Sequence, residues 1–255
     1  MRIKPFLLIL FALLWAIAAP AQELRVAAAS DLRYAMQDIA THFEAETGSK
    51  LSISFGSSGN FYNQIQNGGP YDLYFSADIE YPRNLEAAGL ILPGSLYEYA
   101  TGKLVLWVPQ NSPLNLEKGM DVLLDPRVKK IAIANPAHAP YGRAAISAMQ
   151  SAKVYDRVQD KLVRGDNISQ TAQFVQSGGA DIGFIALSLA LSPPMKSTGR
   201  FVEVPAATYP PIKQAAVILK TSKQQELAQR FLEYFRKPAS AEILRQYGFV
   251  VPTEK

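Results

Sequence analysis

The chain has 255 residues, with 26 Lys and Arg, 22 Asp and Glu, two His and no Cys, which gives a formal charge of +4. At about 100–200 residues per domain, this length predicts one or two domains. Because 48% of the residues are hydrophobic and 19% are charged, the chain can bury a sizeable core. The lack of Cys excludes disulfides, thiolate metal sites, cysteine nucleophiles and a lipid-modified N-terminal Cys, and two His are too few for a His-rich metal site.

The first 21 residues have the pattern of a cleaved secretory signal. Arg2 and Lys4 form a basic start, and an apolar run over 6–18 leads to small residues at 19–21. The run is short for a membrane span, and an uncleaved anchor is the alternative. Cleavage would leave 24 basic against 22 acidic groups, a charge of +2 with no basic stripe, so we expect no nucleic-acid partner. We therefore predict an exported protein, and the lack of a Cys for lipidation favours the periplasm.

Short apolar runs alternate with helical periodicity along the rest of the chain. The first helix has apolar residues at spacings of three and four, and Gly48 is typical of a helix end. This alternation predicts an α/β fold with mainly parallel sheets. We expect strands at 24–28, 51–55, 73–76, 104–109, 131–134, 182–185, 201–204 and 215–219, and helices at 32–47, 61–65, 82–88, 142–151, 154–162, 167–176, 227–235 and 243–247.

Small and hydroxyl residues occupy four places where a predicted strand leads into a predicted helix. A helix start leaves backbone N–H groups unpaired and carries a partial positive charge. Several starts that meet beyond the carboxyl ends of the strands can bind an anion without a cationic side chain. The alternative is that these residues are only helix N-caps. The four junctions are Ala29-Ser30-Asp31, Ser57-Ser58-Gly59-Asn60, Ala139-Pro140-Tyr141-Gly142 and Asp166-Asn167-Ile168-Ser169.

Enzyme chemistry has little support in the sequence. Ser30 or Ser58 could act as a nucleophile with His138 as its base, but there is no G-x-S-x-G elbow and no evident acidic partner for His138. The glycine motifs that cradle phosphates are also absent. We expect no enzyme activity, no cofactor and no cation site, and a secreted serine hydrolase remains the alternative from a different class.

Five segments follow one another in an order that carries a family resemblance. They are VAAAS at 26–30, FGSS at 55–58, DLYFSAD at 72–78, NPAHAPYG at 135–142 and AEILRQYGF at 241–249. Together they resemble periplasmic molybdate-binding proteins, the substrate-capturing components of ABC importers. The likeness spans essentially the whole chain after the signal, and its specificity lies in the ordered set.

The resemblance implies a two-lobed type 2 periplasmic binding protein fold with the oxyanion in the cleft between the lobes. Lobe one would comprise 22–102 plus 208–255, and lobe two 103–207. The two crossings would fall near 99–103 and 206–211, where Pro210 and Pro211 suit a stiff connection.

Carried over position by position, the resemblance implies which residues hold the oxyanion. Ser30 and Ser58 match the two hydroxyl ligands of the family. Tyr141 and Ile168 match positions that offer their backbone N–H groups. The ligand would be molybdate or tungstate, the bound form would be recognised by the membrane subunits of an importer, and the protein would act as a monomer.

Two positions depart from the family pattern. Ala186 stands where the family has a contacting Tyr, and the ring or hydroxyl of Tyr141 could occupy that space; the alternative is a packed Tyr141 with its hydroxyl in solvent. A carboxylate at Asp31 would repel a dianion, so we expect its backbone N–H to face the ligand while its side chain caps the helix or points away. These departures keep open another anion, either sulfate or a small organic acid. An organic acid normally needs an Arg clamp, for which only Arg143 is near.

Overall fold

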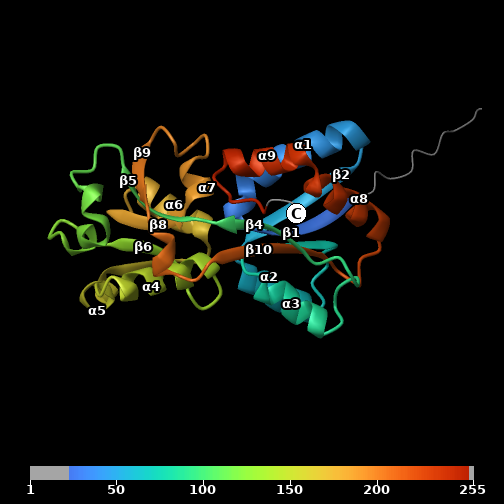
Figure 1. The fold of residues 1–255 in the computed structure, drawn as a ribbon, viewed down its shortest axis with the longest axis horizontal. Helices are drawn as coiled ribbons and strands as arrows, with labels where there is room; N and C mark the ends of the chain where they lie inside the picture. The colour runs from blue at the N-terminus through green and yellow to red at the C-terminus, as the bar shows by residue number, and fades with distance from the viewer. Residues whose placement is uncertain (1–22, 253–255) are drawn as a thin grey trace, which may run out of the picture.

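The computed structural model describes residues 23–252, so the predicted signal at 1–21 lies outside the described residues. The described chain contains ten strands, which form two five-stranded sheets (Figure 1). The strands are β1 Glu23–Ala29, β2 Lys50–Gly56, β3 Leu73–Ser76, β4 Tyr97–Gly102, β5 Leu104–Pro109, β6 Ile131–Ala134, β7 Leu162–Gly165, β8 Ile182–Ala186, β9 Gly199–Glu203 and β10 Ile212–Ile218. The first sheet has the order β2-β1-β3-β10-β4 and the second β7-β6-β8-β5-β9.

Helices cover both faces of each sheet (Figure 1). In the first lobe α1, α8 and α9 lie on one side and α2 and α3 on the other, while α4 and α6 flank the second sheet. No helix in residues 23–252 is both long and apolar enough to cross a bilayer. The helices are α1 Arg33–Thr47, α2 Ser58–Gln66, α3 Glu80–Ala87, α4 Pro140–Ser151, α5 Tyr155–Val158, α6 Ile168–Gln176, α7 Leu187–Ala190, α8 Gln225–Arg236 and α9 Pro238–Gln246.

The chain passes between the two sheets twice. It leaves the first sheet at the end of β4 and enters the second after a single intervening residue, at Leu104. It returns after β9 and re-enters the first sheet as β10, which pairs antiparallel with both β3 and β4. Four of the eight strand pairings in the described chain are antiparallel, so the prediction of mainly parallel sheets is wrong. The antiparallel pairs all involve β5 or β10, the strands that begin immediately after a crossing.

The core of the first lobe follows from the alternation of β1. Val26 and Ala28 face α1 and α8, where Phe43 packs edge-on against Phe231 with ring centroids 5.0 Å apart. Ala27 faces the opposite side and packs with the residues of α2 and α3. A strand with apolar residues on both faces is buried on both sides, which fixes β1 near the middle of its sheet.

Local sequence signals placed most elements correctly. The predicted bounds of the third, fourth and fifth strands are those of β3, β5 and β6. Gly48 ends α1 in the left-handed conformation, with φ of 70°. The expected helix at 154–162 corresponds to α5 followed by a 3-10 turn over Gln159–Lys161, and only its last residue, Leu162, instead begins β7. The strand β4 was not predicted, since its sequence YEYATG is too polar to stand out.

Candidate anion-binding site

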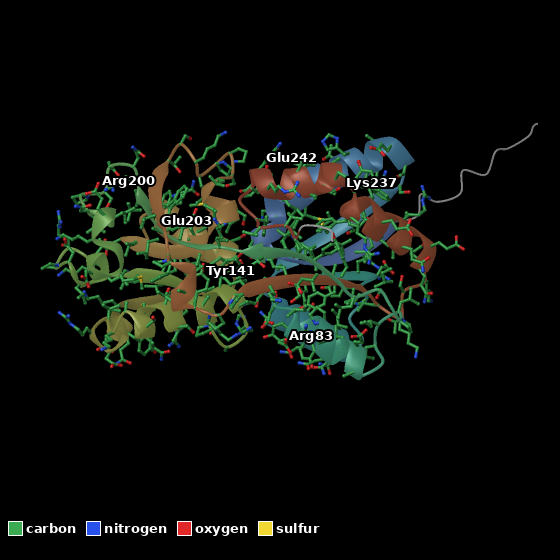
Figure 2. The ribbon with its side chains drawn as sticks, viewed as in Figure 1. Arg83, Tyr141, Arg200, Glu203, Lys237 and Glu242 are labelled. Atoms are coloured by element: carbon green, nitrogen blue, oxygen red, sulfur yellow. The ribbon has the colours of Figure 1, made fainter. Side chains whose placement is uncertain are left out.

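A small cavity lies between the lobes, at the ends of strands where helices begin. Its lining includes all five predicted site residues, which are Ser30, Asp31, Ser58, Tyr141 and Ile168. None of the five is more than 4% exposed. Figure 2 shows Tyr141 between the two lobes. The structure therefore brings together residues from all four strand-to-helix junctions.

The Ser58 side chain is prepared to donate a hydrogen bond. Its Oγ accepts the backbone N–H of Ala77 at 2.9 Å, and a hydroxyl that accepts this bond retains its own proton for another acceptor. The carbonyl of Ser58 accepts the Tyr74 hydroxyl at 2.8 Å, which fixes the backbone at this helix start. Neither Ser58 nor Ser57 caps α2 through its side chain, so the N-cap alternative does not account for them.

Two helix starts direct unpaired amides at the cavity. Tyr141 follows Pro140 at the first position of α4, so its N–H is the first one that this helix offers. Ile168 is the first residue of α6, and the Asn167 side chain caps the amide of Gln170 instead, at 3.0 Å. No acceptor is found within residues 23–252 for the N–H of Tyr141 or of Ile168. Such amides are the donors that bind anions at helix N-termini.

Ser30 is already engaged by the opposite lobe. Its Oγ donates to Oδ1 of Asn167 at 3.2 Å and accepts the N–H of Ser169 at 3.3 Å. The hydroxyl of Ser169 in turn donates to the carbonyl of Ser30 at 3.0 Å. The Ser30 proton would have to rotate away from Asn167 to reach an anion, so this hydroxyl holds the lobes together as well as lining the cavity.

Asp31 and Tyr141 form a buried pair. The Tyr141 hydroxyl donates to Oδ2 of Asp31 at 2.9 Å, and Nε2 of Gln214 donates to the same oxygen at 2.6 Å. The Asp31 side chain therefore does not cap its helix, and this excludes one of the two arrangements expected for it. The alternative of a Tyr141 hydroxyl in solvent is wrong, because this hydroxyl is buried in a hydrogen-bond network. Burial raises the pKa of Asp31 to about 6, and the hydrogen bonds from Gln214 and Tyr141 partly oppose the rise.

The cavity lining contains no Lys, Arg or His among the described residues. Arg143, the only candidate for an organic-acid clamp, instead forms an ion pair with Asp78 at 2.5 Å and also reaches the Tyr81 hydroxyl. This pair joins α4 of one lobe to the segment before α3 of the other. The anion would therefore meet neutral donors only, apart from the Asp31 carboxyl group.

The geometry around His138 does not support an activated serine. Its Nδ1 lies 2.9 Å from Oγ of Ser57, not of Ser30 or Ser58. The Ser57 hydroxyl donates its proton to the carbonyl of His138 at 2.5 Å, so Nδ1 must be the donor in the other contact. A ring nitrogen that carries a proton cannot accept one from the serine. The other ring nitrogen, Nε2, lies 3.6 Å from Oδ1 of Asp166, so the carboxylate lies on the side of the ring away from Ser57.

Ala186 ends β8 and is fully buried. It pairs with Leu104, at the first crossing, and belongs to the same hydrophobic core as Tyr141. The space near the crossing is thus filled by apolar side chains and by the ring of Tyr141. The hydroxyl of Tyr141 faces Asp31.

The comparison with protein families matches residues 24–250 to the model described as bacterial extracellular solute-binding protein. The chain belongs to this family. The match covers both sheets and every residue of the cavity, so the lobes and the site of this solute-binding protein fall within it.

Several relatives are similar over nearly the full length. The molybdate-binding protein ModA of Azotobacter vinelandii is 40% identical over 236 residues, which cover 92% of this chain and 93% of the relative. ModA of Rhodobacter capsulatus is 39% identical over 235 residues, covering 92% and 91%. The solved structure of the A. vinelandii periplasmic molybdate-binding protein has a TM-score of 0.85 at 35% identity, and covers 90% of this chain and all of that one. The solute-binding family and the two-lobed periplasmic binding fold expected from the sequence are confirmed.

Sequence reasoning missed Gln214 as part of the site. This amide is completely buried in β10 and contacts both Asp31 and, at 3.2 Å, the Tyr141 hydroxyl. Its Oε1 accepts the Tyr99 hydroxyl at 2.7 Å. A signal was available, because Gln214 is an amide directly before the apolar run at 215–218 of this strand.

Proposed function

We propose that this protein captures molybdate or tungstate as a dianion and presents it to the membrane subunits of an ABC importer. The observation that carries the proposal is the cavity in which the Ser58 hydroxyl and the unpaired amides of Tyr141 and Ile168 converge with no cation beside them. The relatives that are 40% and 39% identical over this whole site bear the name molybdate-binding protein, which supports the choice of oxyanion.

The donors act through hydrogen bonds to a charged acceptor. Such bonds are roughly twice as strong as neutral ones, and amides at a helix start are already oriented before the anion arrives. Tetrahedral dianions offer acceptors on every side, so each donor finds an oxygen. The absence of a cation from the lining lets the anion leave when the lobes separate, because no ion pair has to be broken.

The lobe boundaries that we propose are 22–102 plus 208–255 and 103–207, with closure about the two crossings. The strand membership of the two sheets supports this division. Contacts across the cleft include the N–H of Gly59 on the carbonyl of His138 at 2.9 Å and the Ser30–Asn167 bond, and they form only when the lobes meet. Closure buries the anion, and we propose that a monomer in this closed form docks on the importer.

We further propose that the protein works in the periplasm after cleavage of residues 1–21 and that it catalyses no reaction. The relative with a solved structure is described as periplasmic, and the family consists of solute-binding proteins. The role that we propose for the protein is therefore to bind and deliver the anion, without a cofactor.

A thermal-shift panel tests the choice of ligand. The panel contains molybdate, tungstate, sulfate, phosphate and a small carboxylate, each added to the protein without its signal. A ligand at 100 times its Kd stabilises the folded state by about 2.7 kcal/mol, which is readily measured. We expect shifts with molybdate and tungstate. A shift with sulfate or a carboxylate alone would identify that anion as the ligand in place of molybdate. The absence of a shift with both molybdate and tungstate would refute the proposal.

A further inference from the structure

Asp31 lines the cavity, and its carboxyl group has an unbalanced environment. Both hydrogen bonds that it accepts from side chains, from Tyr141 and Gln214, go to Oδ2. The other oxygen, Oδ1, is buried and has no hydrogen-bond partner within residues 23–252. A buried polar atom without a partner is unfavourable, and more so if it carries charge.

The groups that face this carboxyl group are all neutral. They are the Tyr141 hydroxyl from α4, the Gln214 amide from β10, the Tyr99 hydroxyl from β4 behind Gln214, and the backbone N–H groups of Asp31 itself and Leu32. Among the described residues, no Lys, Arg or His forms an ion pair or hydrogen bond with Asp31. No cationic side chain of residues 23–252 therefore neutralises an ionised Asp31, and only neutral donors, the two backbone N–H groups among them, favour its charge.

The orientation of Gln214 decides which oxygen can hold a proton. Its Oε1 accepts the Tyr99 hydroxyl, so its Nε2 must face Asp31. Oδ2 then accepts from Nε2 and from the Tyr141 hydroxyl, and two donors leave it no room for a proton of its own. Oδ1 is the oxygen that remains for one.

An anion in the cavity would make an ionised Asp31 still less favourable. Burial already holds the pKa of Asp31 near 6, and a dianion in the same cavity adds like-charge repulsion, which raises the pKa further. Protonation removes the repulsion, and it turns the unpartnered Oδ1 from an acceptor into a donor that suits an oxyanion.

We infer that Asp31 carries a proton on Oδ1 whenever an oxyanion occupies the cavity, so that capture of the anion takes up one proton from solvent. This inference rests on the proposed function of the cavity. The charges balance, because the carboxylate, a proton and the dianion combine into a neutral carboxyl group beside the bound dianion. On release the anion leaves and the proton returns to solvent. Asp31 thus makes the affinity for the anion depend on pH.

The direction of this dependence follows from linkage. The bound state has the higher pKa, so affinity is greatest at low pH and falls as pH rises from the pKa of the free protein towards that of the complex. The fall is at most about tenfold per pH unit for a single proton. Asn at position 31 would mimic the protonated form, because its oxygen can accept from Tyr141 and Gln214 while its NH₂ takes the place of Oδ1–H.

Calorimetric titration with molybdate tests the inference between about pH 6.5 and 8.5, where molybdate itself is fully deprotonated, in pairs of buffers with different ionisation heats. For the wild type we expect uptake of up to one proton and a weakening of affinity as pH rises. Asp31→Asn should take up no proton, show a flat profile, and bind at least about tenfold more tightly than the wild type at the highest pH. The exposed Asp160→Asn removes a carboxylate elsewhere and should retain the wild-type profile.

The outcomes separate the two proposals. Molybdate binding by the wild type without proton uptake, or equal pH profiles for the wild type and Asp31→Asn, would overturn the inference alone. A wild type that binds no molybdate at any pH would overturn the proposed function and the inference with it. If Asp31→Asn does not fold, the proton count for the wild type still decides the question.

Discussion

The hydroxyl of Tyr141 donates a 2.9 Å hydrogen bond to Oδ2 of Asp31, and the two residues come from opposite lobes, 110 positions apart. Gln214 joins the same oxygen from β10, the strand that follows the second crossing. This network therefore links the anion cavity to the place where the lobes are connected. A change at any of its members is expected to affect stability and ligand binding together.

Gly102 makes room for this network. A Cβ at this position would collide with the Tyr141 hydroxyl and lie 2.7 Å from Nε2 of Gln214. We expect Gly102→Ala to lower the free energy of unfolding by about 1–3 kcal/mol, as overpacking does in other cores. Chemical denaturation measures the loss. In a double-mutant cycle, Tyr141→Phe should cost less in the Gly102→Ala protein than in the wild type, and strictly additive effects would contradict the proposed collision.

The raised pKa of Asp31 predicts how stability depends on pH in the absence of any anion. The folded-state pKa of about 6 exceeds the ordinary value of 3.8, so the native protein binds this proton more tightly than the unfolded chain. Stability should therefore fall as pH rises from about 4 to about 6 and then level off. Asp31→Asn should remove this fall and be more stable at pH 8 by on the order of 2–3 kcal/mol, with the difference vanishing below about pH 4. Denaturation curves at three pH values measure it, and a constant difference between the two proteins would count against the assignment.

Ser58→Ala should weaken anion binding by about 1.5–3 kcal/mol, because a hydrogen bond to a charged ligand is lost. The substitution also removes the acceptor of the Ala77 N–H, so the melting temperature should fall as well. Calorimetric titration of the folded variant separates the two effects. Ser52→Ala, an exposed serine on β2, is the matched control and should bind as the wild type does. A change in Kd below about threefold for Ser58→Ala would show that its hydroxyl does not contact the anion.

The ion pair between Arg143 and Asp78 joins the lobes and should slow their opening. Because both side chains are partly exposed, we expect Arg143→Gln to cost no more than about 1 kcal/mol of affinity, mainly through faster dissociation, with a smaller effect at high salt. Stopped-flow dissociation of the anion measures this. Arg83→Gln breaks a pair with Glu80 that lies within α3, and should leave dissociation unchanged. Equal dissociation rates for both variants would show that the Arg143–Asp78 ion pair does not slow the opening of the lobes.

His138→Ala distinguishes a binding protein from a hydrolase. It removes one hydrogen bond to Ser57 across the cleft, so anion affinity should fall by no more than about 1 kcal/mol. Titration with molybdate measures this, and an ester substrate assayed in parallel reports hydrolysis. An esterase activity of the wild type that disappears in His138→Ala would favour the hydrolase.

Local patterns in the sequence were enough for most of the fold. Apolar runs such as the one that becomes β5 have a strong signal, because a strand buried on both faces must be apolar throughout. The strand β7 was missed because Val154, Val158 and Leu162 have helical spacing, although the helical segment ends at Lys161 and Leu162 already belongs to the strand. Strand direction was mispredicted because it depends on how the chain returns from the second lobe, which no local pattern records.

The site was predictable in its positions and less so in its contacts. The four junctions could be identified because each joins a strand to a helix start with small or polar residues, and the cavity lies where they meet. The hydrogen-bond partners of Asp31 could not be predicted, because Gln214 lies 183 positions away in sequence. Ser30 was expected to be either a hydroxyl ligand or a helix N-cap, and its bond to Asn167 likewise depends on how the two lobes meet.

The position of β10 has a consequence for the order in which the protein folds. This strand lies between β3 and β4, yet it follows the entire second lobe in sequence. A chain that emerges from its N-terminus can complete the second sheet, whose strands run without interruption from β5 to β9, while the first sheet still lacks its fourth-placed strand. The facing edges of β3 and β4 stay open until residue 218 has emerged. The lobe that begins the chain is therefore the last to be finished, and a chain that stops before β10 would expose two unpaired strand edges to aggregation.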